Sequence, residues 1–318
     1  MISIVDFAEK YSAAWDNLVL NKSANGTLFH TRHFLSYHNE EAFLDRSIML
    51  FRGDQLVSVL AVAELENGSF FSHPGTSCGG PVIHRDHFKV SEMIEIFAAI
   101  DEKYRKSLGM RICEDSLIDQ SNALLLYHFA SNLSVHIEIS SYKELNAPDL
   151  VGSIYRSSTR SAVRAVFRQH DRFKIAETVN EYSNFYAILK ENLGKHNVSP
   201  THTRDEFLSL KNLLNEDQKL VICLEKDGTI ACGVWIIRAS PTAWHAQYIA
   251  KNYDTEIAGV VEAALIKCME IARDLNARNF SLGISTEDQG ARLNLGLISF
   301  KEKLGCKLQN RYLLLPKA

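Results

Sequence analysis

Four arginines recur at every fourth residue in the stretch "IYRSSTRSAVRAVFRQHDR": Arg156, Arg160, Arg164 and Arg168. On a helix this spacing places them on one face as a continuous cationic stripe. Like charges at that spacing cost about 0.2–0.5 kcal/mol for each exposed pair, so acidic neighbours or a bound polyanion must offset them. A guanidinium binds two phosphate oxygens at once. Two interpretations stay open: a solvated face with salt bridges, and a site where Arg156, Arg160 and Arg164 bind a phosphate-bearing substrate.

Two histidines are candidates for acid–base chemistry. His196 follows a predicted helix, and His245 lies in the predicted strand "WHAQYIA". An imidazole with a pKa near 6.5 can accept a proton from an attacking amine at physiological pH. Strand alternation predicts that His245 and Gln247 share one face, with Trp244 and Tyr248 on the other. We expect catalytic roles for both histidines and substrate contacts for Gln247 and Tyr248; a purely structural role for these residues stays open.

The stretch "GISTEDQGARLNLGLISFKEKLG" near the C-terminus supplies further polar candidates. Glu287 can act as a base or hold a substrate amine, Asn294 can hydrogen-bond a sugar or an amide, and Lys301 can meet a carboxylate or phosphate. Ser285 has an alternative interpretation as a helix N-cap. We therefore expect Glu287 to be catalytic and Asn294 and Lys301 to bind substrate.

A glycine-rich turn, "SHPGTSCGGPV", holds His73, Ser77 and Cys78. Adjacent glycines allow backbone N–H groups to approach an anion, but the spacing fits neither a P-loop nor a dinucleotide fingerprint. His73 and Ser77 are expected to bind substrate. Small neighbours make Cys78 a conceivable nucleophile, a role we do not assign to it.

Composition limits the class of protein. The chain has 318 residues, 46 % of them hydrophobic, and 35 Lys+Arg against 38 Asp+Glu give a net charge of −3, which argues against a dedicated nucleic-acid binder. No run of apolar residues is long enough for a membrane helix, and the first residues lack the pattern of a signal peptide, so we expect a cytoplasmic protein. Six scattered cysteines without a CxxC pair indicate neither a disulfide framework nor a zinc site; most should be reduced core residues, and no metal is expected.

The chain contains a weak internal repeat. The triplet "HTR" begins at His30 and again at His202, 172 residues apart, and the flanking segments align in step. Each half reads as a helix, three antiparallel strands, a helix and a strand. Chance similarity is the alternative. The repeat predicts an α/β protein with mixed α+β sheets in two domains, 1–150 and 151–318, the second beginning with the arginine-bearing helix.

In this order of elements the chain resembles the FemAB-like acyl- and aminoacyltransferases, which have tandem GNAT-like domains, and within them the branch found in surface-polysaccharide pathways. The likeness rests on "NGTLFHTRHFL", "SHPGTSCGGPV", "STRSAVRAV", "LGKHNVSPTHT", "HAQYIAKNY" and "GISTEDQGARLNLGLISFKEKLG". It implies that the strand before "GISTEDQG" splays from its neighbour to open a cleft.

The resemblance implies an N-acyltransferase that moves an acyl or aminoacyl group to an amine, with an amino sugar of a cell-surface glycan precursor, nucleotide-linked or lipid-linked, as the acceptor. Acyl-CoA would be the co-substrate. However, the loop where such enzymes cradle the pyrophosphate reads "AKNYDTEIAG", with two acids and one glycine, so an aminoacyl-tRNA or an acyl carrier protein is an open alternative as donor. A Fem-type, aminoacyl-tRNA-dependent peptidyltransferase and an inactive module that binds a phosphorylated ligand are the rival functions.

Overall fold

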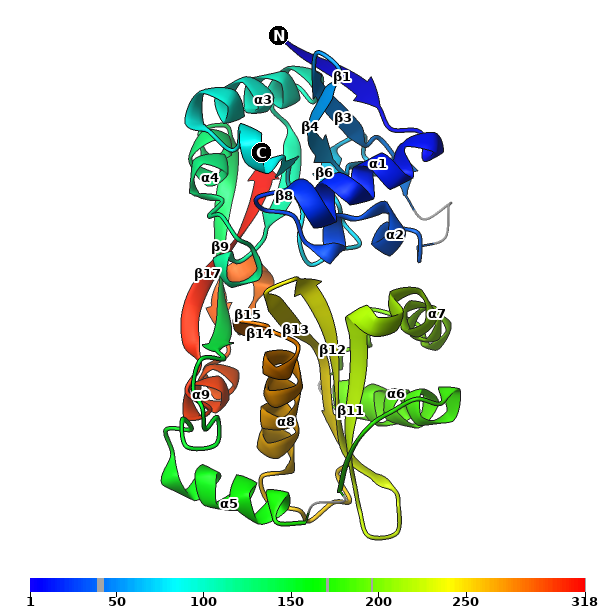
Figure 1. The fold of residues 1–318 in the computed structure, drawn as a ribbon, viewed down its shortest axis with the longest axis vertical. Coiled ribbons are helices and arrows are strands. Elements are labelled where there is room, and N and C mark those ends of the chain that lie inside the picture. The colour runs from blue at the N-terminus through cyan, green and yellow to red at the C-terminus, as the bar shows by residue number, and fades with distance from the viewer. Residues whose placement is uncertain (39–42, 170–171, 196, 318) are drawn as a thin grey trace. The chain divides into compact units, whose positions relative to one another are not determined.

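The structure is a computed structural model that describes residues 1–38, 43–169, 172–195 and 197–317. Helices and groups of consecutive strands follow one another along the chain (Figure 1). The first half contains β1 (Ile2–Asp6), α1 (Ser12–Asn17), α2 (Arg32–Leu35), β2 (Leu44–Asp45), β3 (Ile48–Arg52), β4 (Gln55–Leu60), β5 (Ala63–Glu64), β6 (Phe70–Ser72), β7 (Val82–Ile83), α3 (Val90–Lys103), β8 (Leu108–Ile112), α4 (Ala123–Ala130) and β9 (Leu133–Glu144). The second contains α5 (Ser157–Phe167), β10 (Phe173–Ile175), α6 (Val179–Gly194), α7 (Arg204–Leu214), β11 (Gln218–Leu224), β12 (Ile230–Ser240), β13 (Ala243–Lys251), α8 (Val260–Asp274), β14 (Asn279–Ile284), β15 (Thr286–Glu287), β16 (Arg292–Leu293), α9 (Leu295–Lys303) and β17 (Lys307–Pro316).

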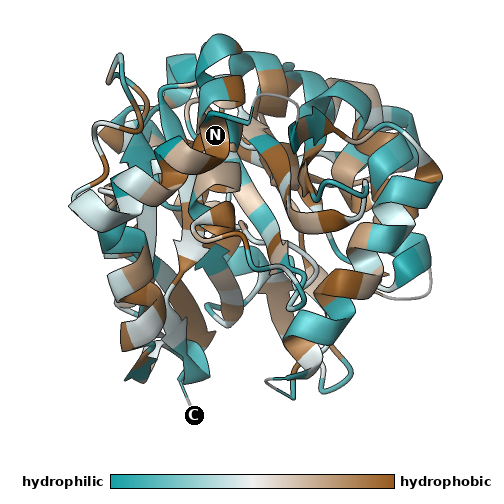
Figure 2. Ribbon diagram, turned by 90° about the horizontal axis from the view of Figure 1, so that it is seen from below, coloured by the Kyte–Doolittle hydropathy of each residue, from teal (hydrophilic) through white to brown (hydrophobic). Residues whose placement is uncertain are grey.

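The chain forms two compact units. Unit 1 comprises residues 1–140, 284–293 and 309–318, and unit 2 comprises residues 141–283 and 294–308. Many residues of the strands are apolar, whereas the helices carry both polar and apolar residues (Figure 2). This is the pattern of amphipathic helices packed on sheets. The predicted α/β class with mixed sheets is confirmed.

Unit 1 is built on two groups of strands. One sheet has the order β1-β3-β4-β7, and a second group runs β17-β8-β6-β5-β2. Helices α3 and α4 contribute Met93, Ile96, Phe97 and Leu125 to a core shared with strand residues such as Leu50. Since these side chains repeat at three- and four-residue spacing in "MIEIF", burial of one helix face explains why this segment is helical.

Unit 2 has an antiparallel meander, β10-β11-β12-β13, which β14 extends in parallel, with helices on both faces. Val234 and Ile236 point to α8 and α5 and share their core. On the opposite face, Gly233 lies so close to Phe185 of α6 that an added Cβ would be 2.4 Å from the ring. Trp235 packs edge-on to Phe207 of α7 at 4.8 Å between ring centroids. Continuous burial along β12 therefore follows from cover on both faces.

Equivalent hydrogen bonds support the internal repeat. Thr31 caps α2 by accepting from the Phe34 N–H, and Thr203 caps α7 by accepting from the Glu206 N–H. The carbonyl oxygens of the two "HTR" histidines also accept side-chain donors from the preceding helix: Trp15 Nε1 donates to His30 (2.8 Å) and Tyr186 Oη to His202 (2.9 Å). The repeated letters therefore correspond to repeated contacts.

The division into units differs from the expected single boundary at residue 150. The first half ends in β9, whose residues 141–144 belong to unit 2, and the second half ends in β17, whose residues 309–316 belong to unit 1. There Tyr312 pairs with Ile112 and Leu314 with Met110 of β8. Each half thus gives part of its last strand to the other unit. Strand pairing over about 200 residues decides this exchange, and no local pattern in the sequence reports it.

The structure also corrects the expectation for two of the cysteines. Cys78 and Cys113 form a disulfide, although they are 35 residues apart and lack a motif. Cys78 belongs to the glycine-rich turn and Cys113 follows β8, and the parallel bridge between Gly79 and Ile112 brings the two segments together. The expectation of reduced, buried thiols is confirmed for the other four, Cys223, Cys232, Cys268 and Cys306.

Candidate active site

Strands β13 and β14 separate soon after they meet. Their parallel register holds three pairs among the residues that the structure describes: Ala243 with Asn279, Trp244 with Phe280, and His245 with Ser281. Both strands continue beyond this point, to Lys251 and Ile284. The opening that the resemblance implied before "GISTEDQG" is therefore present in unit 2, and His245 occupies its last paired position.

The side chains of His245, Ser281 and Lys301 and the backbone of Gly283 meet at this opening. His245 Nδ1 lies 3.3 Å from the hydroxyl of Ser281, which also accepts the N–H of Gly283 at 3.1 Å. Gly283 has a φ of +67°, and an added Cβ would be 3.3 Å from Cε1 of His245. Lys301 of α9 is only 2 % exposed and donates its Nζ to the Gly283 carbonyl at 2.8 Å. The lysine thus orients the backbone beside the histidine and is not a surface cation.

A β-bulge in β13 corrects the predicted faces. Trp235 pairs with Tyr248, whereas Ile236 pairs with Ala246, so Gln247 is the extra residue. The bulge places Tyr248 on the face opposite Trp244 and together with His245. Tyr248 Oη lies 2.7 Å from Nδ1 of His202, and burial raises the pKa of its phenol. Alternation assigned Tyr248 to the wrong face because the bulge changes the phase of the strand.

The remaining candidates of the C-terminal motif belong to local structure. Glu287 accepts from both Nε and Nη2 of Arg292, at 3.0 and 2.8 Å, in the hairpin of β15 and β16. Asn294 caps α9 by accepting the N–H of Leu297 at 3.0 Å. Ser285 is not an N-cap; it is buried, and its hydroxyl has no hydrogen-bond partner among the residues that the structure describes. Glu287 belongs to unit 1 and His245 to unit 2, so the catalytic role of Glu287 stays a prediction.

The corresponding opening in the first half is closed. Strands β6 and β8 pair in parallel through Ser72 and Met110, and the next turn then returns to β8. Gly79 donates its N–H to the Arg111 carbonyl at 2.7 Å, and the Cys78–Cys113 disulfide joins the same two segments. An added Cβ on Gly79 would lie 1.7 Å from the carbonyl oxygen of Ser72. Ser77 lies on this turn and is partly buried.

His73 is the counterpart of His245 in the repeat, 172 residues earlier. It is buried, and desolvation together with the neighbouring His38 lowers its pKa to about 4. Its imidazole lines a pocket of about 540 Å³ in unit 1. His73 is therefore neutral near pH 7 and belongs to a second concave site, separate from the opening in unit 2.

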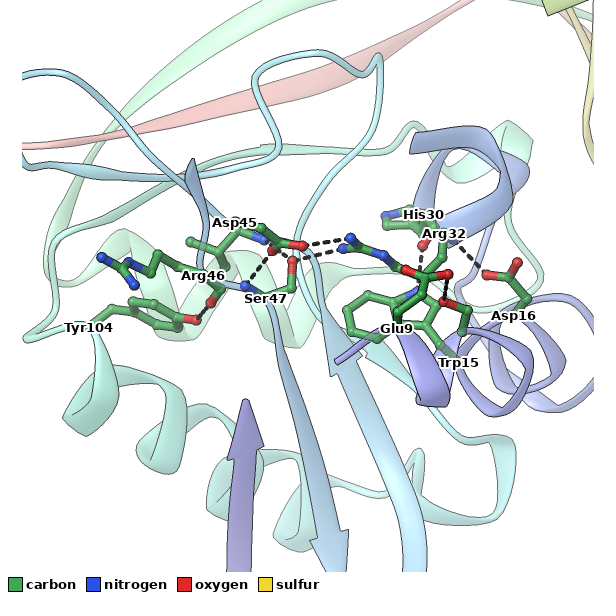
Figure 3. A network of polar contacts seen from close by, with 11 residues as sticks. Glu9, Trp15, Asp16, His30, Arg32, Asp45, Arg46, Ser47 and Tyr104 are labelled. Carbon is green, nitrogen blue, oxygen red and sulfur yellow. Dashed lines mark hydrogen bonds and ion pairs between the residues drawn. The ribbon is translucent and has the colours of Figure 1, made fainter. Parts of the chain in front are cut away.

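Arg32 is the centre of a polar network in this pocket, which the sequence analysis did not predict (Figure 3). Its Nη2 contacts Asp45 Oδ2 at 2.5 Å, its Nη1 donates to Ser47 at 3.1 Å, and its guanidinium lies 3.8 Å from the ring centre of Phe7. Burial alone would raise the pKa of Asp45, but Arg32 and Ser47 lower it overall. Arg32 is the last residue of the first "HTR" triplet. The triplet therefore marks this site in the sequence as well as the internal repeat.

Arginines of the α5 stripe have unequal roles. Arg160 donates to the carbonyl oxygens of Ile154 and Tyr155, so it holds the chain that enters α5. Arg164 makes an exposed ion pair with Asp149 at 3.8 Å. Within the described ranges, the side chains of Arg156 and Arg168 have no ion-pair or hydrogen-bond partner, and both residues are exposed. The salt bridge of Arg164 agrees with the interpretation of a solvated face, and binding of a phosphate-bearing substrate stays a prediction.

The loop before α8 lacks features of a pyrophosphate cradle. Thr255 is hydrogen-bonded to Glu225, and Asp254 and Glu256 are exposed. Gly259, which caps α8 with a φ of +74°, faces Ala162 of α5, and an added Cβ would lie 2.8 Å from the alanine Cβ. Contact with α5 therefore covers Gly259 at the start of α8, and the loop before it carries two exposed carboxylates, which would repel an anion.

His196 lies outside the described residues, so its role stays a prediction. Elsewhere in the part of the chain that the structure describes, no group of three or more His, Cys, Asp or Glu side chains is arranged to hold a metal ion. Among those same residues, no helix is both long enough and apolar enough to cross a bilayer.

No protein-family model and no curated protein sequence matches the chain. Solved structures do. FemX is 13 % identical, with a TM-score of 0.71 and coverage of 98 % of this chain and 97 % of that one. L-PGS from Bacillus licheniformis is 15 % identical (TM-score 0.56; 86 % and 84 % covered), and a tandem GNAT protein from the clavulanic acid biosynthesis pathway is 12 % identical (TM-score 0.55; 99 % and 97 % covered).

The chain has the FemAB-like, tandem GNAT fold. The predicted fold resemblance is thereby confirmed over nearly the whole length of the protein. At these identities the likeness concerns the fold, and the chemistry has to be argued from the residues.

Proposed function

We propose that this protein is an acyl- or aminoacyltransferase whose working cleft is the opening between β13 and β14. The observation that carries the proposal is the contrast between the two halves. In unit 2 the strands separate beyond His245 and Ser281, whereas in unit 1 the turn at Cys78 to Gly80 fills the corresponding place. One half thus keeps an opening with a histidine at its last paired residue, and the other half does not.

In the proposed reaction, the nitrogen of an acceptor amine attacks the carbonyl carbon of the donor. A C–N bond forms while the bond from that carbon to the sulfur or oxygen of the donor breaks. His245 takes the proton that the amine loses and returns it to the departing sulfur or oxygen. Backbone N–H groups of β13 on the side that faces the opening would stabilise the oxyanion, and Lys301 and Ser281 keep the histidine and Gly283 in position.

The donor is a proposal of its own. Acyl-CoA, an aminoacyl-tRNA and an acyl carrier protein all provide an activated carbonyl carbon. The acidic loop at Asp254 and Glu256 disfavours a pyrophosphate at the start of α8, and the resemblance of the sequence to aminoacyltransferases supports an aminoacyl donor. Acyl-CoA would need cationic partners elsewhere in unit 2.

Calorimetric titration tests the proposal. Acetyl-CoA, CoA and an aminoacyl-tRNA are titrated into the protein at low and moderate salt, and the productive donor is then offered an amino sugar, with product detected by mass spectrometry. We expect micromolar binding of at least one donor and a mass increase on the amine. Binding of none of the donors would contradict a transferase.

An inactive phosphate-binding module is the second candidate, because Arg156 and Arg168 are exposed cations without described partners. It predicts salt-dependent binding of a polyanion without any transfer. As the acceptor of an active enzyme we propose an amino sugar of a cell-surface glycan precursor, and as its location the cytoplasm. The acceptor rests on the resemblance, and the location rests on the sequence pattern of the chain.

A further inference from the structure

The pocket of unit 1 has a charge balance opposite to that of a phosphate site. It encloses about 540 Å³ and opens between α1, α2 and the glycine-rich turn, within the range of small-molecule sites. Among the residues that the structure describes, its lining carries three carboxylates, Glu9, Asp16 and Asp45, and one guanidinium, Arg32. Histidine aside, these described side chains have an excess of two negative charges.

The positive groups in the pocket are already engaged. Arg32 directs one guanidinium nitrogen to Asp45 and another to Ser47, and its flat face lies on Phe7. The backbone N–H groups at the start of α2 are also engaged: Arg32 N donates to Asp16 Oδ1 at 2.6 Å and His33 N to Asp16 Oδ2 at 3.0 Å. An incoming phosphate would have to displace Asp45 or Ser47 from the guanidinium and Asp16 from the backbone N–H groups.

Rings form the inner wall. His73 lies 4.8 Å from Phe43 and 5.8 Å from His38 between ring centroids, and its pKa of about 4 keeps it uncharged near pH 7. Ring faces attract an organic cation and cover the apolar face of a saccharide. The rim adds the hydroxyl groups of Ser12 and Ser36 as hydrogen-bond partners.

We propose that this pocket binds an amine-bearing, hydroxyl-rich small molecule, of the amino-sugar class. Its ammonium group would be held by Glu9 and Asp16, its ring by the wall of Phe43 and His73, and its hydroxyls by the rim. All the residues proposed to bind this ligand belong to unit 1. That the bound amine is the acceptor of the transfer reaction rests on the proposed function.

The test is a calorimetric titration of the whole protein, without any acyl donor. The probes are the β-1,4-linked disaccharide of glucosamine, its N,N′-diacetylated form, and inorganic pyrophosphate. We expect the diamine to bind about threefold to tenfold more tightly than the diacetylated form. The affinity of the diamine should fall as the salt concentration is raised. Equal binding of the two saccharides, or tighter binding of pyrophosphate, would overturn the proposal.

Two variants locate the site. Glu9→Gln removes a carboxylate whose only described contact is the hydroxyl of Ser12, so it should fold normally, and it should weaken diamine binding about threefold or more. Glu66→Gln, on an exposed turn of the same unit, is the matched control and should leave affinity unchanged. Equal affinity of both variants would contradict the assignment. Because no donor is present, such a failure leaves the transferase proposal untouched, and failure of donor binding leaves the pocket untouched.

Discussion

At the residue scale, His245 carries the proposed proton transfer, because it occupies the last paired position of β13 and β14 and lies within 3.3 Å of Ser281. His245→Ala should lower kcat by about 10²- to 10⁴-fold with little change in donor affinity. His136→Ala, which changes a partly buried histidine of unit 1, is the matched control and should keep kcat within about twofold. Full turnover by the His245 variant, measured by product mass, would remove it from the mechanism.

His30 provides a pH-dependent test of the fold. It is fully buried and accepts hydrogen bonds from Thr27, and burial lowers its pKa from 6.5 to about 4. Protonation is therefore easier in the unfolded chain, so this residue leaves stability unchanged above pH 6.5 and reduces it as pH falls from 6.5 to 4. The free energy of unfolding in urea should lose about 3 kcal/mol less over this range in His30→Gln than in the wild type. Identical pH profiles would contradict the assignment.

Sequence reasoning located residues correctly where their position follows from their neighbours in the chain, and failed where contacts join separate segments. His245 was predicted on a strand and lies at the opening. Arg32 and Asp45 were missed because a loop brings them together, and Asn294 was taken for a ligand although it caps α9. Glu287 was predicted to be catalytic because a carboxylate can act as a base; in the structure it belongs to unit 1, whereas His245 belongs to unit 2.

At the element scale, the turn from Cys78 to Gly80 closes the first-half opening, and Gly79 is its tightest point. Gly79→Ala should lower the free energy of unfolding by more than about 2 kcal/mol, because the new Cβ would lie 1.7 Å from the Ser72 carbonyl oxygen. Gly194→Ala, at the end of α6 with open space around it, should be neutral or stabilising by up to about 1 kcal/mol. Urea unfolding measures both. Equal stability of the two variants would mean that the turn does not pack as described.

The types of the elements could be predicted from the sequence, but the sheet face on which each side chain of β13 lies could not. The strands of both halves and the helices that follow them were expected from apolar periodicity, and they are present. The expected unit of three antiparallel strands occurs in the second half, as β11, β12 and β13. In the first half β3 pairs with β4, but β6 pairs with β5 and β8 in a different sheet, so the prediction was wrong there. The bulge at Gln247, which turns Tyr248 toward the side of His245, leaves no mark in the sequence. Its cause is the register between β12 and β13, which is fixed by packing on both faces of the sheet.

At the scale of the whole molecule, the exchange of final strands makes each unit depend on the other half of the sequence. Leu314 of β17 is fully buried in the core with Leu50 and Phe97 of the first half. Leu314→Ala should cost about 2–5 kcal/mol and speed hydrogen exchange in α3 and β4, not in α8. Leu308→Ala, 49 % exposed on the same strand, should stay within about 0.5 kcal/mol of the wild type. Faster exchange confined to α8 would contradict the exchange of strands.

The central claim is that the opening between β13 and β14, and not its first-half counterpart, receives the donor. Hydrogen exchange with and without acetyl-CoA, and with and without an aminoacyl-tRNA, tests it most directly. We predict that at least one donor slows exchange in residues 245–251 and 279–283 and leaves 70–80 and 108–113 unchanged. Protection of the first-half segments instead, or no protection of either by both donors, would contradict the account.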